Sequence, residues 1–150
     1  MTTLIVVPCG GAKLDHRAPA RYLYTGAHFR YTLRRAVWLA EGRPGVDVAI
    51  LSALHGLVDL DDELDPYDVT LDAAARRSEL VARLVVQLLD RDVPDRIVAL
   101  TPNAYTAALS SALDELGVRD EGVELVTPLA GSRGIGEQRG RLARLSWAEL

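Results

Sequence analysis

The sequence predicts an α/β fold, in the form of a three-layer αβα sandwich around a mainly parallel sheet of about four strands. Four apolar runs of strand length, each rich in β-branched residues, alternate along the chain with amphipathic stretches of helix length. Continuous apolar runs of this kind are typical of strands buried on both faces of a parallel sheet. The alternation favours right-handed crossovers, and a length of 150 residues suits a single domain, 1–150.

Two connections after the expected strands are too long for simple turns. The strands themselves are Leu4–Val7, Val48–Leu51, Ile97–Leu100 and Val123–Val126. The long connections run from Cys9 to Tyr24 and from Ala53 to Thr70. Both begin at the carboxyl ends of strands, where open α/β sheets form their ligand crevices. We therefore expect the functional site at this edge of the sheet.

Four helices are expected from the spacing of apolar residues. In the first, Phe29, Leu33, Val37 and Ala40 share one face, and Gly42 is a plausible end. The others run over about residues 71–90, 103–116 and 136–145, and Gly117 suits the C-terminal cap of the third. Their apolar faces consist of Leu80, Leu84, Val85 and Leu88, then Tyr105, Ala108, Leu109, Ala112, Leu113 and Leu116, and finally Leu142 and Leu145.

The charged side chains are distributed unevenly. The net charge of −4 argues against a surface that is uniformly attractive to nucleic acid. Residues 1–45 nevertheless carry seven basic and two acidic side chains, and residues 128–150 carry four basic and two acidic ones. Residues 46–72 carry eight acidic side chains and no basic one. Both ends of the chain are therefore basic, and the segment 46–72 is acidic.

The remaining composition narrows the class of protein. No apolar stretch approaches the roughly 20 residues that cross a bilayer, and the N-terminus lacks the features of a signal peptide. We therefore expect a cytoplasmic protein with no membrane partner. Cys9 is the only cysteine, which excludes an internal disulfide, and the three histidines show no metal-binding spacing. Neither a metal nor an organic cofactor is expected.

The first long connection carries a candidate anion site. Cys9-Gly10-Gly11 lets backbone N–H groups approach an anion closely, and Lys13 supplies charge. A flexible turn is an equally good interpretation, because the Gly-Lys-Ser/Thr spacing of a Walker loop is absent. Cys9 itself is either a nucleophile, favoured by the strand end and by Lys13, or a buried structural thiol, which is the commoner case.

A second candidate anion site lies where the first helix begins. Tyr24-Thr25-Gly26 opens this helix, whose first turn has free N–H groups that could act together with Thr25 and His28. For Thr25 alone, capping of the helix is the preferred interpretation.

His55-Gly56 follows the second expected strand. A histidine at this position can act as a base, as an acid, or as a hydrogen-bond donor to a base edge or an oxyanion. The alternative is a loop histidine that is bonded to the backbone. Most of the acidic side chains after it are expected to form a solvated turn, namely Asp59, Asp61, Asp62 and Glu63.

The stretch Asp65-Pro66-Tyr67-Asp68 has the strongest claim to chemistry in the acidic segment. Pro66 fixes one backbone dihedral, and Tyr67 offers an aromatic plate for stacking a base beside a carboxylate. We expect Asp68 or Asp65 to be the functional carboxylate.

The last loop is rich in glycine. Gly131, Gly134 and Gly136 suit a turn whose N–H groups face an anion, with Ser132 and Arg133 beside it. Glu137 at the start of the following helix ordinarily compensates the helix dipole. In a second interpretation it reaches the crevice, because the loops end at the same edge of the sheet.

Three segments together resemble, in the same order, the conserved blocks of an uncharacterised bacterial and phage domain family. They are VPCGGAKLDHRAPARYLYTGAHF, LSALHGLVDLDDELDPYDVTL and PLAGSRGIGEQ. Members typically have a Cys-Gly start followed by lysines, a Leu-Tyr-Thr-Gly step, and a Ser-Ala-x-(Tyr/His)-Gly-Leu stretch that ends in Pro-Tyr-Asp. This chain departs from the pattern at the lysine run, reduced to Gly11-Ala12-Lys13, and at His55, where an aromatic residue is usual.

The same blocks resemble those of a wider group. The middle block looks like the Tyr-Gly-Leu…Pro-Tyr segment of the YaaA peroxide-stress proteins, which are associated with DNA binding. The first block is similar to a Pro-Cys…Lys-Pro-Tyr block of archaeosine synthases. This group is associated with folds like uracil-DNA glycosylase, a parallel four-stranded sheet between helices. The resemblance implies such a fold and does not imply a particular reaction.

The leading hypothesis is an enzyme that processes the base of a nucleic acid or nucleotide, most concretely a DNA-glycosylase-like hydrolase that cleaves an N-glycosidic bond. Tyr67 would stack on the base, Asp68 or Asp65 would orient water or stabilise the sugar cation, and His55 would contact the base or the leaving group. The other substrate-binding candidates are Cys9, Gly10, Gly11, Lys13, Tyr24, Thr25, Gly26, His28, Ser132, Arg133 and Glu137.

Two alternatives come from other classes of protein. A non-catalytic DNA-binding stress protein of the YaaA type would bind DNA in a salt-dependent way and release no base. A small-molecule nucleoside or nucleotide hydrolase or transferase is slightly favoured over a duplex-DNA enzyme by the overall acidity. The expected partner is therefore DNA, a nucleotide or a nucleoside.

Overall fold

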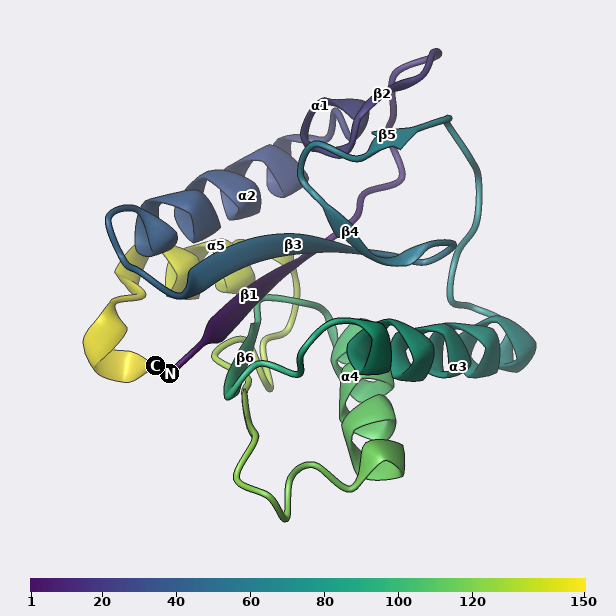
Figure 1. Ribbon diagram of the computed structural model, residues 1–150. Coiled ribbons are helices and arrows are strands. Elements are labelled where there is room, and N and C mark those ends of the chain that lie inside the picture. The colour runs from purple at the N-terminus through teal and green to yellow at the C-terminus, as the bar shows by residue number, and fades with distance from the viewer.

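The computed structural model describes residues 1–150 as a five-stranded sheet between two layers of helices (Figure 1). The strand order is β4-β3-β1-β6-β7. The four parallel strands are β1 (Thr3–Pro8), β3 (Val46–Ser52), β6 (Arg96–Ala99) and β7 (Glu124–Val126). β4 (Gly56–Asp59) runs antiparallel to β3 at one edge. The predicted α/β class and the mainly parallel sheet are confirmed.

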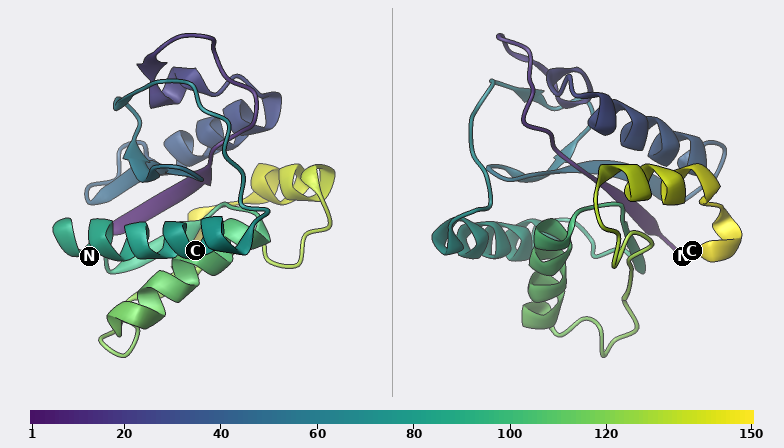
Figure 2. Two further views of the ribbon diagram at one scale, coloured as in Figure 1. Left: turned by 90° about the vertical axis from the view of Figure 1, so that its right-hand side faces the viewer. Right: turned by 180° about the vertical axis from the view of Figure 1, so that it is seen from behind.

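Helices cover both faces of the sheet (Figure 2). On one face lie α2 (Ala27–Ala40) and α5 (Ile135–Arg144), and on the other lie α3 (Ala74–Asp90) and α4 (Asn103–Leu116). All four helices were expected from the sequence, and their observed limits differ from the expected ones by a few residues. Gly117 has a φ of +68° and caps α4 as predicted.

The central strand β1 explains the continuous apolar run at the start of the chain. Leu4 and Val6 belong to the core under α3 and α4, whereas Ile5 and Val7 belong to the core under α2 and α5. Because successive side chains point to opposite faces, a strand covered on both sides needs apolar residues at every position. β1 therefore joins the two halves of the core.

The segment from Ala53 to Thr70 is more than a simple turn, as expected, but it is not a loop throughout. It contains β4 and β5 (Glu63–Leu64), and β5 pairs with β2 (Ala18–Pro19) from the other long connection. A further short helix, α1 (Ala20–Leu23), follows β2, and a 3-10 helix (Trp147–Glu149) closes the chain. These pieces have two to four residues, too few to show a periodicity in the sequence.

The buried face of α2 is rotated from the expected one. Phe29 is buried as predicted, but the other buried residues are Thr32, Ala36 and Leu39, and Val37 is 42% exposed. The Thr32 hydroxyl donates a hydrogen bond of 2.9 Å to the His28 carbonyl, so this polar side chain can lie against the sheet at little cost. Ala36 is small, which allows the helix to approach the sheet closely.

One glutamine clamps the turn between β3 and β4. Leu57 N–H donates to Gln87 Oε1 at 2.8 Å, and Gln87 Nε2 donates to the carbonyls of His55 and Leu57 at 2.9 and 3.0 Å. Gly56 lies between them with a φ of +71°, and a Cβ at this position would overlap Gln87 Oε1. Gly56 therefore serves both the backbone conformation and the close approach of α3.

No helix of this structure is long and apolar enough to span a bilayer.

We predict that Gly56→Ala lowers the free energy of unfolding by about 2–4 kcal/mol, because it adds left-handed backbone strain and displaces the Gln87 amide. The measurement is chemical denaturation followed by circular dichroism. Gly136→Ala is the matched control, because Gly136 is a helical residue of α5 with no neighbour that a Cβ would meet. It should stabilise the protein by roughly 0.5–1 kcal/mol. Equal losses in both variants would contradict the role of the clamp.

Candidate functional site

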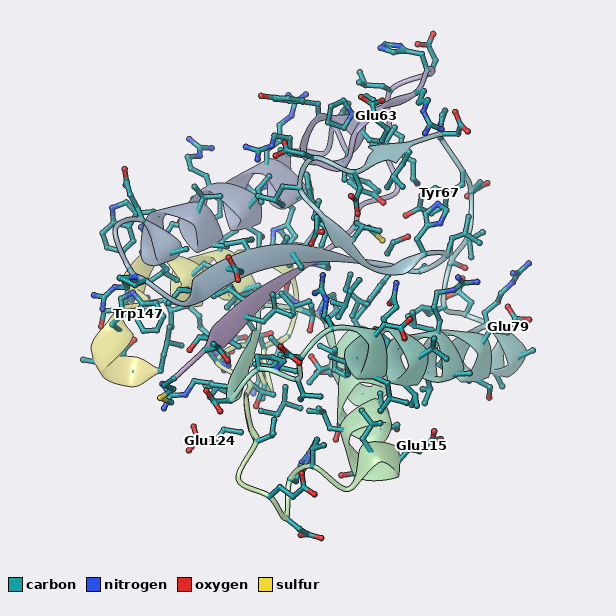
Figure 3. The ribbon with its side chains drawn as sticks, in the orientation of Figure 1. Glu63, Tyr67, Glu79, Glu115, Glu124 and Trp147 are labelled. Atoms are coloured by element: carbon teal, nitrogen blue, oxygen red, sulfur yellow. The ribbon has the colours of Figure 1, made fainter.

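A chain of three hydroxyl groups lies at the carboxyl ends of β1 and β3. Tyr67 Oη is 2.5 Å from Ser52 Oγ at the end of β3, and 2.5 Å from Tyr24 Oη, which precedes α2. Ser52 and Tyr24 are fully buried, and Tyr67 is half-buried on the segment between β5 and α3 (Figure 3). Three segments that are distant in sequence therefore meet at one polar cluster.

The hydrogen-bond inventory orients this chain. Ser52 Oγ accepts bonds from the N–H groups of Leu54 at 3.2 Å and His55 at 3.0 Å, which occupies its two lone pairs. Its own proton is then donated to Tyr67 Oη, and the Tyr67 proton to Tyr24 Oη. The chain of donors runs from Ser52 to Tyr24, so the Tyr24 proton is its free end.

Two side chains flank the Tyr67 ring. Lys13 Nζ lies 4.5 Å from the ring centroid, and the His55 ring packs against Tyr67 edge to face with centroids 5.2 Å apart. Lys13 Nζ also donates to the Gly11 carbonyl at 3.1 Å, which leaves two of its three protons for a ligand. Because Lys13 lies over one ring face, the predicted use of Tyr67 as an open stacking plate is restricted to the opposite face.

Cys9 adjoins the cluster at the end of β1. It is half-buried, and its Sγ lies 3.4 Å from Tyr105 Oη on α4. Cys9 also packs against the core cluster that contains Tyr24 and that Tyr67 contacts. The thiol therefore belongs to the polar cluster, and a purely apolar structural role does not describe it.

The phenols stay protonated at neutral pH. Burial raises the pKa of Tyr24 to about 12, and burial raises the pKa values of Tyr67 and Tyr105 as well. Burial, followed by the nearby Arg83 guanidinium, lowers the pKa of His55. The cluster therefore combines neutral hydrogen-bond donors and a neutral imidazole with the Lys13 cation, which suits a ligand that carries or develops negative charge.

The structure separates the two carboxylates expected to be functional. Asp65 is exposed, and its carboxylate lies 3.2 Å from Arg17 Nη1 on the outer side of the β2–β5 pair. Asp68 is also exposed, directly follows Tyr67, and makes no ion pair or hydrogen bond within the chain. Of the two, Asp68 is the one that has no partner in the chain and that is next to Tyr67 in the sequence.

The second candidate anion site is built differently from the expectation. Thr25 does not cap α2, so that prediction was wrong: the cap residue is Gly26, with no side-chain hydrogen bond. The Thr25 N–H donates to the Ala12 carbonyl at 2.9 Å, which ties the two loop segments together. Burial, followed by the Arg139 guanidinium, lowers the pKa of His28, whose Nδ1 is buried without a hydrogen-bond partner.

The glycine-rich last loop is held by its own contacts. Ser132 Oγ donates to the Leu129 carbonyl at 2.7 Å. Glu137 accepts from the Arg133 N–H at 3.2 Å and pairs with Arg141 at 3.1 Å, in keeping with its ordinary role at the start of α5. The Arg133 side chain is exposed and has no carboxylate partner. This loop makes no hydrogen bond to the hydroxyl cluster.

Sequence reasoning missed Ser52, Tyr105 and Gln87. Ser52 directly follows the expected strand Val48–Leu51 and was given no role, and Tyr105 was placed only on an apolar helix face, yet both bond to members of the cluster. A serine that ends a buried strand is a usable signal, because such a hydroxyl must find partners. For Gln87, in the middle of α3, no local pattern distinguishes a buried clamp from a solvated side chain.

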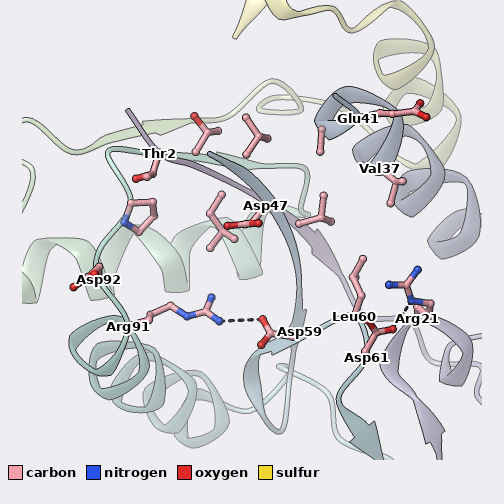
Figure 4. Close-up of a pocket in the computed structure, with 16 residues that line it drawn as sticks. Thr2, Arg21, Val37, Glu41, Asp47, Asp59, Leu60, Asp61, Arg91 and Asp92 are labelled. Atoms are coloured by element: carbon pink, nitrogen blue, oxygen red, sulfur yellow. Dashed lines mark hydrogen bonds and ion pairs between the residues drawn. The ribbon is translucent and has the colours of Figure 1, made fainter. Parts of the chain in front are cut away.

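A separate cavity lies away from the hydroxyl cluster. It has a volume of about 840 Å³ and opens at the amino ends of β1 and β3, between the C-terminal ends of α2 and α3 (Figure 4). Its charged lining includes Asp47, Asp59 and Asp61, and the last two pair with Arg91 and Arg21. No three His, Cys, Asp or Glu side chains of the chain converge in an arrangement that could hold a metal ion.

Comparisons with known proteins locate the chain among its relatives. A structure similar to this one is the crystal structure of AF0587, a protein of unknown function, with a TM-score of 0.51 and 16% sequence identity. The match covers 95% of this chain and 43% of that chain, so this chain spans less than half of the neighbour's length, and the likeness shows the fold alone. A search of curated proteins finds no match. The model of a family of unknown function (DUF6884) matches residues 4–144, and the chain therefore belongs to this family.

Proposed function

We propose that this protein is a nucleic-acid or nucleotide base-processing enzyme, and that its most concrete reaction is cleavage of an N-glycosidic bond. The observation that carries the proposal is the Ser52–Tyr67–Tyr24 hydroxyl chain, with Lys13 over the Tyr67 ring and His55 at its edge. It lies at the carboxyl ends of parallel strands, where ligands bind in open α/β folds.

The hydroxyl chain is costly for a purely structural element. Apolar residues would fill the same space without a requirement for matched donors and acceptors, and a half-satisfied network would be destabilising. Networks of titratable groups with shifted pKa values are more frequent at functional sites. A network that fixes the Tyr67 ring also fixes the position of Lys13 and His55, which favours a pre-organised site.

The surrounding side chains match the charges that N-glycosidic cleavage develops. As the carbon–nitrogen bond breaks, the base takes the electron pair while the sugar becomes cationic; a water oxygen then bonds to the sugar carbon, and its proton passes to the base. The Lys13 ammonium and the neutral His55 ring would stabilise the departing base. The free carboxylate of Asp68 would orient the water or face the sugar cation.

Resemblance in sequence supports the same class of substrate. The Gly56-Leu57…Pro66-Tyr67 segment resembles the YaaA proteins, and the Pro8-Cys9 segment resembles archaeosine synthases. The structure adds a physical reason for these two segments to act together, because Cys9, Lys13 and Tyr67 all lie in or beside one cluster. The proposal also includes a fold like that of uracil-DNA glycosylase.

The direct test is incubation of the protein with DNA and with free nucleosides that carry natural and modified bases, followed by mass spectrometry of released base. We expect release by the wild type and a loss of about 10²-fold or more in Asp68→Asn and in Tyr67→Phe. Asp61→Asn and Tyr22→Phe are the matched controls. Asp61 pairs with Arg21 at the surface, and Tyr22 is 63% exposed, so both variants should stay close to wild type.

Folding is checked in the same samples, because Tyr67→Phe leaves Ser52 and Tyr24 without their shared partner and costs about 1–3 kcal/mol of stability. Asp68→Asn changes an exposed side chain and should leave stability within about 0.5 kcal/mol. Absence of released base from every substrate class, or equal losses in the Asp61→Asn control, would rule out this reaction for the site.

The pKa of His55 predicts how base release depends on pH on the acid side. Burial and Arg83 lower this pKa from 6.5, so the neutral ring persists below that pH. We expect base release to stay level from about pH 8 to about pH 6.5 and to fall only below it. Arg83→Gln removes a positive charge that opposes protonation, raises the pKa of His55 and moves this fall to higher pH. An unchanged profile in Arg83→Gln would exclude His55 as the titrating group.

A further inference from the structure

The arginines that lack a carboxylate partner are concentrated on one layer of the molecule. Seven of the sixteen arginines form ion pairs, and the other nine have no carboxylate within 4.0 Å. Two of the nine are Arg77 and Arg83 on α3. The remaining seven lie on or next to α2 and α5, and they are Arg30, Arg34, Arg35, Arg43, Arg133, Arg139 and Arg144.

The charge of this layer opposes that of the chain. Residues 27–43 and 133–144 together carry eight arginines and two glutamates, so they hold six positive charges in a chain whose net charge is −4. The rest of the chain therefore carries a net charge of −10. Such a separation gives a positive face that an averaged net charge conceals.

The two helices run side by side in the same direction. Arg35 donates to the carbonyls of Leu142 and Leu145 at 3.0 and 3.1 Å, and Trp147 Nε1 donates to the Leu39 carbonyl at 2.6 Å. Both helices also contribute to the same core under one face of the sheet. Figure 2 shows α5 beside α2 on that side of the sheet. The layer is thus a single continuous surface.

Arginine and aromatic side chains alternate on this surface. The Arg35 guanidinium lies 4.4 Å from the Trp38 ring centroid, and Arg139 lies 5.8 Å from the Tyr31 centroid. Trp38 is 56% exposed and follows Arg30 and Arg34 at successive intervals of four residues. These three side chains therefore form one row along the outer side of α2, with about 6 Å between neighbours.

We propose that this row, together with the exposed Arg133 and Arg144, binds the phosphate backbone of a nucleic acid strand. Guanidinium groups without carboxylate partners bind phosphate oxygens in a bidentate way, and an exposed indole next to them can stack on a base. The inference rests on the proposed function and deepens it, because it names a polynucleotide as the substrate class.

Other polyanions fit the surface less well. A membrane-binding helix needs a broad apolar face beside its basic residues, whereas α2 and α5 expose three large apolar side chains among their arginines, namely Val37, Trp38 and Ile135.

The test is fluorescence anisotropy of a labelled single strand of about 20 nucleotides and of its duplex, measured over a range of salt concentrations. The double variant R30Q/R34Q removes two charges from the row. We expect it to weaken single-strand binding about tenfold at low salt and to reduce the slope of log affinity against log salt by about 1.4, from two contacts at about 0.7 each.

The matched control is R76Q/R119Q, which removes the same charge from exposed positions at the start of α3 and after α4. It should leave the affinity and the salt slope close to those of the wild type. Equal weakening in both double variants, no binding of either nucleic acid, or tighter binding to phosphatidylserine vesicles than to nucleic acid would overturn the proposal. Circular dichroism of each variant verifies its fold.

The two proposals fail in different ways. If the protein binds strands through Arg30 and Arg34 but releases no base, the nucleic-acid-binding surface is supported and the proposed enzyme activity is contradicted. If the protein releases base from free nucleosides but binds neither strand nor duplex, the enzyme activity is supported and the nucleic-acid-binding surface is contradicted. Tyr67→Phe separates the two sites further, because it should lower base release about 10²-fold or more and leave strand binding close to that of the wild type.

Discussion

The Tyr67 hydroxyl is the contact on which the arrangement of the candidate site depends. It bonds to Ser52 at the end of β3 and to Tyr24 before α2, so it holds the segment after β5 against the carboxyl edge of the sheet. Without it, the ring that Lys13 and His55 contact would have no fixed position. The Gln87 clamp acts on the same edge from the other helix layer, because it fixes the turn that carries His55.

Most carboxylates of the acidic segment, residues 46–72, lie away from the Tyr67 hydroxyl. Four of the segment's eight carboxylates, those of Asp59, Asp61, Glu63 and Asp65, form ion pairs with arginines. Arg21 pairs with Asp61 at 2.9 Å, Arg17 with Asp65 at 3.2 Å, and Arg91 with Asp59 at 3.1 Å. Because these pairs are exposed, each contributes little to stability, and the pairs of Arg17 and Arg21 match the basic connection to the acidic one. Asp68 is one of the four carboxylates without an arginine partner, and among these it alone is next to Tyr67 in the sequence, which is the basis for its selection.

Sequence reasoning reached as far as local patterns extend. The parallel strands and the four main helices were predictable because each has its own apolar periodicity, and Gly117 because a left-handed cap favours glycine. The four residues of β4 have no periodicity of their own, and their strand character comes only from pairing with β3. Thr32 lies on the buried face of α2, where Leu33 was expected. Its burial depends on a hydrogen bond to the backbone, which a hydropathy pattern does not contain. The bonds of Tyr67 to Ser52 and Tyr24 span 15 and 43 positions, so folding alone brings them together.

The basic layer and the hydroxyl cluster are joined by α2. Its first residue, Ala27, is three positions after Tyr24, and Phe29 packs on the Tyr24 ring with centroids 5.0 Å apart. At a rise of about 1.5 Å per residue, Arg30 lies within the first turn of the helix. A strand held by Arg30 and Arg34 would therefore lie along α2 and reach the carboxyl edge of the sheet at its N-terminal end. A base turned out of such a strand there would meet the side of the molecule on which Lys13 and Tyr67 lie, so one helix would supply both the binding row and the approach to the cluster.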